Sequence, residues 1–131
     1  MHKILQPKGW ARPVGYANGI EARGRQIYLA GLVGWNAACK WEAKDLTGQI
    51  RQTLLNIVSV LREAGAGPEH IVSMTWYVLD KKEYIAQRAE IGRAWRDVFG
   101  RVFPAMAVVQ VAGLVEDAAK VEIQVVAVVP D

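Results

Sequence analysis

The chain has 131 residues, of which 52% are hydrophobic and 22% are charged, and its formal net charge is +3. These proportions are typical of one soluble globular domain with its own core, and we take residues 1–131 as that single domain. The basic residues are spread along the chain without runs, so the charge pattern argues against nucleic acid as a partner. The only cysteine, Cys39, excludes an intramolecular disulfide.

The first residues, MHKILQPKGWARP, lack an apolar core of signal-peptide length. No apolar run reaches the roughly 18 residues that a membrane helix needs. We therefore expect a cytoplasmic protein with no membrane partner. The five tryptophans are many for such a short chain, and aromatic side chains beyond the needs of a small core often line pockets or subunit interfaces.

The first predicted elements are two strands, at residues 14–22 and 26–33. Only the polar turn Arg23-Gly24-Arg25 separates them, which favours a hairpin. Residues 34–44 follow as a tryptophan-rich loop. A helix is predicted over residues 45–64, because Asp45 can cap it and apolar residues recur at helical spacing before the stop signal AGAGP.

The second half of the chain also contains predicted strands and a predicted helix. Residues 71–79 are rich in branched and aromatic side chains, which predicts a strand. Asp80 and Glu83 have the spacing of a helix cap, and a second helix is predicted from there to about Phe99. Strands at 104–112 and 120–129 close the chain. The order β-β-α-β-α-β-β predicts an α+β fold, with a mixed sheet and both helices on one face.

The last predicted strand indicates that the chain self-associates. One set of its side chains is entirely apolar, and the alternate set, Glu122, Gln124, Val126 and Val128, is also largely apolar. Two helices cover only one face of a sheet, so the second face needs other cover. We expect an oligomer in which sheets pack face to face across subunits.

Several kinds of site are not expected. The two histidines, His2 and His70, form no cluster with metal-ligand spacing, and no phosphate loop or dinucleotide fingerprint is present. No serine lies on a sharp elbow, and Cys39 has no histidine close in sequence. An enzyme built on this chain would act by positioning and polarising its substrate, with no metal, no cofactor and no covalent nucleophile.

The pattern resembles the Rid family, also called the YjgF or translation-inhibitor family. The segments that carry the resemblance include VGYANGI, YLAGLVG, QTLLNIVSVLREAG, FPAMAVVQVAGL and VEIQVVAV, and the match runs from about residue 13 to residue 129. The resemblance implies a chorismate-mutase-like fold and a homotrimer, with the sheets inside and small-molecule clefts between neighbouring subunits. Well-studied members hydrolyse reactive enamines and imines to 2-keto acids and ammonia.

The resemblance also assigns site residues. Tyr16 matches a tyrosine of the first strand that lines the cleft, and Gly31 matches a glycine whose backbone helps to hold the substrate. Glu122 matches a glutamate of the last strand that positions water. The family arginine that binds the substrate carboxylate falls on Met106, which is the main departure. Trp35 and Asn36 lie in the loop that borders the cleft in the family.

Each of these residues also has a structural interpretation. Glu122 could be an exposed strand residue paired with a lysine, Tyr16 could pack at an interface, and Gly31 could serve backbone conformation alone. An arginine donates charge-assisted hydrogen bonds of roughly 1.5–3 kcal/mol each, and methionine cannot replace them. An imino acid should therefore bind poorly in the usual pose, unless another arginine enters the cleft. The candidates are Arg12, Arg23 and Arg101.

Three functions stay open. The first is a Rid-like enamine or imine deaminase with an altered substrate preference. The second is a non-catalytic trimer that binds a small metabolite on the same scaffold. The third is the ribonuclease or translation-inhibitor role attached to parts of the family, which the even charge distribution and the lack of a histidine pair disfavour.

Overall fold

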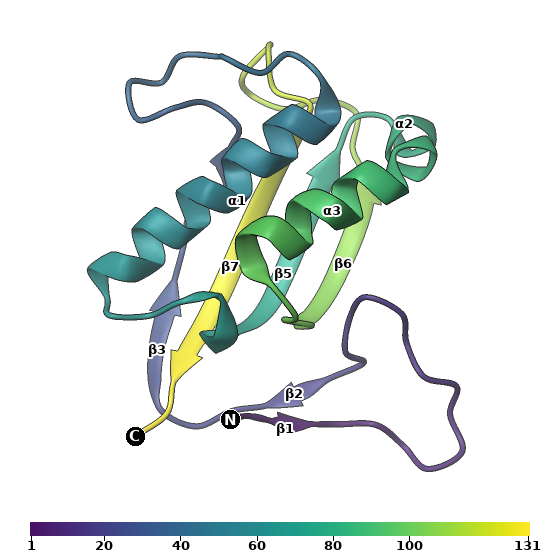
Figure 1. Cartoon of the computed structure of the whole chain (residues 1–131), viewed down its shortest axis with the longest axis vertical. Helices are drawn as coiled ribbons and strands as arrows, with labels where there is room; N and C mark the ends of the chain where they lie inside the picture. The colour runs from purple at the N-terminus through teal and green to yellow at the C-terminus, as the bar shows by residue number, and fades with distance from the viewer.

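The structure is a computed structural model that describes residues 1–131, and it consists of one main sheet with helices packed on one side (Figure 1). The sheet has the strand order β3-β7-β5-β6, and the short β4 also pairs with β7. All pairs are antiparallel except β5 with β6, which is parallel, so the sheet is mixed as expected. Its strands are β3 (Arg25–Tyr28), β4 (Leu32–Val33), β5 (Ile71–Val78), β6 (Ala105–Gln110) and β7 (Val121–Val129).

The first predicted helix is confirmed as α1 (Leu46–Glu63). The Asp45 side chain accepts a hydrogen bond from the Gly48 amide and caps it. A short 3₁₀ helix, η1 (Pro68–His70), leads into β5.

The second predicted helix is present as two pieces, α2 (Lys81–Ala86) and α3 (Arg88–Phe99). They meet at Gln87, where the regular helix is interrupted. The Gln87 side chain accepts a hydrogen bond of 2.6 Å from Thr47 Oγ1 of α1, a tertiary contact that helical periodicity does not reveal.

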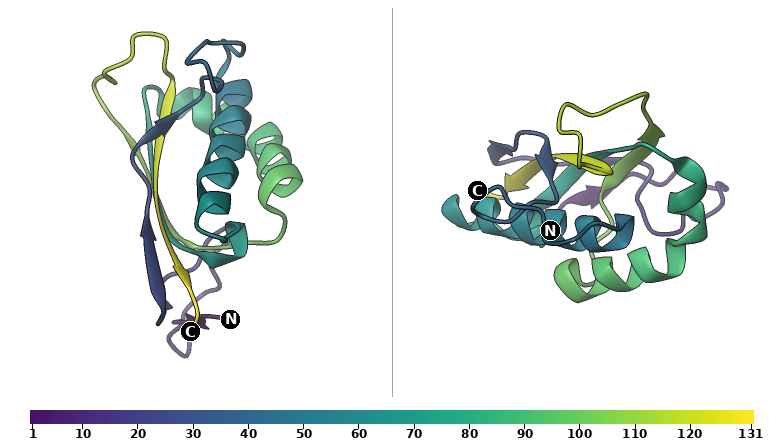
Figure 2. Two further views of the ribbon diagram at one scale, coloured as in Figure 1. Left: turned by 90° about the vertical axis from the view of Figure 1, so that its left-hand side faces the viewer. Right: turned by 90° about the horizontal axis from the view of Figure 1, so that it is seen from above.

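The helices and the sheet enclose one core. Trp76, Met74 and Val78 of β5 and Ile123 of β7 are buried there against Ile50, Leu54 and Ile57 of α1 and Ile91 of α3. Viewed edge-on, α1 and α3 lie on the same side of the sheet and no helix covers the other side (Figure 2). The expectation of an α+β fold with both helices on one face is therefore confirmed.

The predicted hairpin between residues 14–22 and 26–33 is wrong. Only Ile20–Glu21 of the first segment forms a strand, β2, and it pairs with β1 (Lys3–Ile4) in a separate two-stranded sheet. The second segment forms β3 and β4, which both pair with β7. β2 thus pairs with the N-terminal residues and not with β3. The Ala17 amide donates to Pro104 O, which ties the segment before β2 to the start of β6.

The face of the sheet without helices, here called the open face, carries polar and apolar side chains together. Thr75 and Tyr77 of β5 alternate with its buried residues and lie on this face, as do Ala107 and Val109 of β6. Tyr28 of β3 is also there, directly opposite Val126, and it is 70% exposed. None of the helices of the chain is both long and apolar enough to cross a membrane.

Candidate functional site

The sheet register places Met106 and Glu122 on opposite faces. Met106 is paired with Met74, which is buried in the core beneath the helices. Glu122 is paired with Tyr77, whose neighbours Trp76 and Val78 point into the core, so Glu122 lies on the open face. Glu122 and Met106 therefore lie in two separate hollows of one chain.

The first hollow, here called the open-face hollow, has a volume of about 300 Å³ and contains Glu122 and Gly31. Tyr77, Gln124 and the loop residues Val111, Gly113, Leu114 and Val115 complete its lining. Gly31 lies directly against Glu122, because a Cβ atom built at position 31 would be 2.3 Å from Glu122 Oε2. The half-buried Glu122 carboxylate forms no hydrogen bond or ion pair in the chain, so the expected alternative of a lysine partner is not seen.

The position of Glu122 depends on Gln49, a buried residue of α1. The Gln49 side chain donates a hydrogen bond of 2.9 Å to Ala118 O and accepts one of 2.8 Å from the Lys120 amide. These bonds fix the loop two residues before Glu122. Gln49 matches no motif of the chain, and its place among the apolar residues of a helix face is the only sign in the sequence of a buried polar contact.

The second hollow is a groove of about 800 Å³ between β6 and the helices α2 and α3, here called the helix-side groove. Met106 lines it together with aromatic residues and several cations. Its aromatic lining comprises Tyr16, Trp76, Tyr84, Trp95 and Phe103, and its cations are Lys81, Arg88, Arg96 and Arg101.

Gln110, on the same side of β6 as Met106, closes one end of this groove. Its Oε1 accepts a hydrogen bond of 2.9 Å from the Lys81 amide, which ties the end of β6 to the start of α2.

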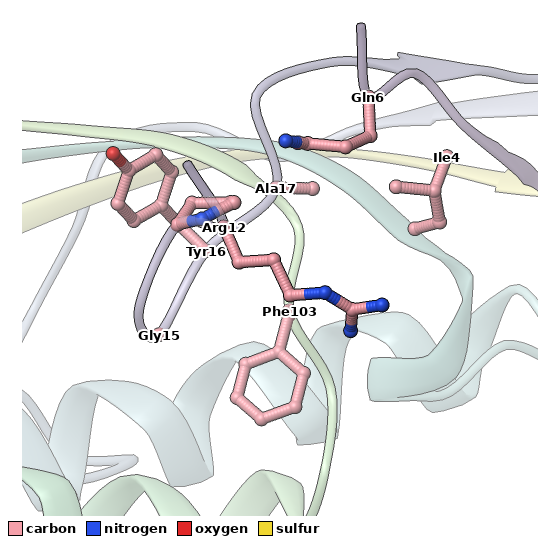
Figure 3. A pocket seen from close by; sticks show the side chains of 8 residues that line it. Ile4, Gln6, Arg12, Gly15, Tyr16, Ala17 and Phe103 are labelled. Atoms are coloured by element: carbon pink, nitrogen blue, oxygen red, sulfur yellow. The ribbon is translucent and has the colours of Figure 1, made fainter. Parts of the chain in front are cut away.

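Tyr16 lies where this groove meets a smaller hollow of about 400 Å³ near the N-terminal segment. Arg12 and Phe103 also line the smaller hollow, and Figure 3 shows the Arg12 side chain running past Phe103 with its guanidinium directed away from the ring of Tyr16. Of the three arginines considered as substitutes for the missing one, Arg12 is thus in the N-terminal hollow and Arg101 in the helix-side groove. Arg23 is exposed, and its Nε lies 3.7 Å from an Asp131 oxygen.

Trp35 and Asn36 line neither the open-face hollow nor the helix-side groove. Trp35 packs against Trp41 of the same loop, with ring centroids 5.6 Å apart. The Asn36 side chain accepts hydrogen bonds from the amides of Ala38 and Lys40 and donates one to Glu42. The hydrogen-bonding capacity of Asn36 is therefore used to shape its own loop.

Two polar residues of α1, Gln52 and Asn56, hold this loop in place. Asn56 donates hydrogen bonds to Val33 O and Trp35 O, at 3.0 Å and 2.7 Å, and Gln52 donates to Asn56 Oδ1.

No group of three or more His, Cys, Asp and Glu side chains is placed to hold a metal ion.

The fold and the two hollows define an α+β protein of the chorismate-mutase-like type. The family profile described as Endoribonuclease L-PSP matches residues 10–129. The chain therefore belongs to this family, the Rid or YjgF family of the sequence analysis.

Similar proteins agree with this assignment. A RutC family protein of Aquifex aeolicus is 33% identical over 131 residues, which cover 98% of this chain and 99% of that protein. The 2-iminobutanoate/2-iminopropanoate deaminase of Salmonella typhimurium is 29% identical over 129 residues, which are 98% of each chain. The crystal structure of the Rid family protein YyfB from Yersinia pestis superposes with a TM-score of 0.86 at 28% identity and covers 98% of both chains.

Proposed function

We propose that the protein hydrolyses a reactive imine or enamine to a carbonyl compound and ammonia, with a substrate preference altered by Met106. The observation that carries the proposal is the carboxylate of Glu122, which lies in a hollow, beside a glycine backbone and without a partner in the chain. A relative that matches nearly the whole chain is named for the hydrolysis of 2-imino acids, which supports the same reaction class here.

In this proposal Glu122 acts as the general base. It takes a proton from water while the water oxygen bonds to the imine carbon, and the π electrons of the C=N bond move to nitrogen, which takes a proton from solvent. Glu122 then returns its proton to the nitrogen of the tetrahedral adduct as the C–N bond breaks and ammonia leaves. The hydroxyl proton passes to solvent, and a C=O bond forms. A carboxylate without an ion-pair partner is free to carry this proton, and such a base contributes roughly 10²–10⁴-fold to rate.

The two hollows lie on opposite faces of one sheet, so one chain cannot offer Glu122 and Met106 to the same small molecule. A site containing both needs Glu122 from one copy and the helix-side groove from another. We therefore propose that the active assembly is the homotrimer implied by the family resemblance, with the site completed between subunits. The uncovered apolar residues of the open face, such as Val126 and Val109, support this assembly.

Substitution of Glu122 by Gln tests the reaction. Imines generated from amino acids by an amino acid oxidase are followed as 2-oxo acid and ammonia. The wild type should speed their decay over buffer, and Glu122→Gln should reduce this effect on the order of 100-fold without a change in fold. Glu116→Gln, in the exposed loop before β7, is the matched control. A wild type that binds such compounds and never accelerates their decay would favour the non-catalytic metabolite-binding trimer.

A further inference from the structure

The helix-side groove has the size and lining of a site for a bulky organic molecule. Its volume of about 800 Å³ falls within the range of small-molecule sites. Trp95, Tyr84 and Phe103 give it an aromatic surface. The buried Trp76 supports this surface from the core, because its ring centroid is 6.0 Å from that of Trp95 and Tyr84 meets it edge-on. The flexible Met106 side chain lies on the same surface. A molecule the size of alanine or pyruvate would leave most of this surface uncovered.

The rim of the groove carries cations without counterions. Lys81, Arg88, Arg96 and Arg101 line it, and no aspartate or glutamate does. None of these four side chains takes part in an ion pair of the chain. Four cations therefore line this groove with no acidic side chain beside them. Such a concentration of unpaired cations beside an apolar wall attracts an anionic ligand.

Arg88 and Tyr84 offer the most defined donors within this rim. They are four residues apart on either side of the Gln87 junction, where the turn is continued by a hydrogen bond from the Gln87 amide to Glu83 O. Both side chains line the groove, and neither forms a hydrogen bond in the chain. The guanidinium is near enough to the phenol to act on its pKa through charge. Together they present N–H and O–H donors to one acid group.

We propose that the helix-side groove binds a 2-imino acid, or its enamine, with a large apolar side chain, and that Arg88 and Tyr84 hold its carboxylate in place of residue 106. The aromatic surface and Met106 then cover the side chain. This inference rests on the proposed function for the reaction itself, but the binding step can be tested without turnover.

Calorimetric titration with three probes tests the binding step. Phenylpyruvate carries both a ring and a carboxylate, pyruvate carries only the carboxylate, and phenylacetone carries only the ring. The wild type should bind phenylpyruvate at least tenfold more tightly than either of the others. Arg88→Gln and Tyr84→Phe should each weaken phenylpyruvate about tenfold, the loss expected for one charge-assisted hydrogen bond, and leave phenylacetone unchanged. Arg93→Gln, on the same helix but outside the groove, is the control.

Failure of this inference can be distinguished from failure of the proposed function. Arg88-dependent binding of phenylpyruvate with no imine turnover would keep the ligand assignment and reject the hydrolase. Imine turnover by the wild type that is equal in Arg88→Gln and Arg93→Gln would keep the hydrolase and reject the carboxylate clamp. Absence of phenylpyruvate binding, or equal affinity for pyruvate, would overturn the ligand class.

Discussion

The carboxylate of Glu122 lies against the backbone of Gly31, so closely that a Cβ atom at position 31 would be 2.3 Å from Oε2. Two strands make this contact, because Gly31 precedes β4, which pairs with β7 at Val33 and Glu122. The glycine is not needed for an unusual backbone, since its φ is not in the left-handed region. Its missing side chain is what leaves room for the carboxylate.

Substitution of Gly31 by Ala should therefore displace the Glu122 carboxylate and leave the fold intact. The atom in the way is the end of a flexible side chain, so the free energy of unfolding should change by less than about 1 kcal/mol. Imine hydrolysis should fall at least about tenfold, since a general base needs hydrogen-bond reach to its proton.

Gly113→Ala is the matched control, because it lines the same hollow and a Cβ atom there meets nothing within 4 Å. Urea denaturation and steady-state rates, measured on both variants, separate the two effects. Equal activity in the two variants would show that the Gly31–Glu122 contact has no part in the reaction.

Substitution of Met106 by Arg should restore hydrolysis of 2-iminopropanoate. A guanidinium at this position would add one or two charge-assisted hydrogen bonds to a small substrate acid, which corresponds to about a tenfold or larger gain in kcat/KM. Met106 packs against the core, so some loss of thermal stability should accompany the gain. Met106→Leu keeps the apolar surface and is the control. High and equal activity in the wild type and in both variants would show that residue 106 does not set the preference.

Local patterns predicted the helices and the last three strands, because each depends on neighbouring residues. The family resemblance named Gly31 and Glu122 separately, but it did not predict their contact. Local patterns could not predict that Met106 and Glu122 lie on opposite faces of the sheet. Whether Met106 shares a face with Glu122 depends on register across β6, β5 and β7, and three strands far apart in sequence fix that register. Tyr77 lines the open-face hollow because the register of β5 and β7 pairs it with Glu122. No motif in the β5 sequence pointed to a functional residue.

The sequence also did not identify the hydrogen-bond donors that line the helix-side groove. By sequence, Arg88 looks like an ordinary solvated helix residue. The folded chain distinguishes it from Arg93, because Arg88 lines the groove without an ion pair and Arg93 has Glu90 at 3.9 Å. The hairpin prediction failed because a strand can pair with any of several partners, and β1 lies in residues 1–13, where no strand was predicted.

The wild type should have the mass of a trimer in solution, as measured by light scattering or native mass spectrometry. Ala107→Arg should reduce this mass, because Ala107 is exposed on the open face and an arginine there would place an unpaired charge in the proposed interface. Ala89→Arg, exposed on α3, should leave it unchanged. A monomeric wild type would remove the basis for a site shared between subunits.

The titration of Tyr84 provides an independent test of its proximity to Arg88. Burial raises the pKa of Tyr84 above its ordinary value of 10.0, and the positive charge of Arg88 lowers it in part. The unfolded chain therefore loses this proton at lower pH than the folded chain does. The stability that the buried neutral phenol contributes is complete below about pH 10 and is lost as the pH rises through the folded value.

Replacement of Arg88 by Gln should raise the pKa of Tyr84 further, because the phenolate loses its nearby positive charge. Ultraviolet difference spectra report phenolate formation, and Tyr84→Phe identifies the Tyr84 signal among the four tyrosines. The alkaline loss of stability should be smaller in Tyr84→Phe than in the wild type. Arg93→Gln should titrate like the wild type, because Arg93 does not line the groove. An unchanged Tyr84 titration in Arg88→Gln would mean that the guanidinium lies too far from the phenol to share one carboxylate with it.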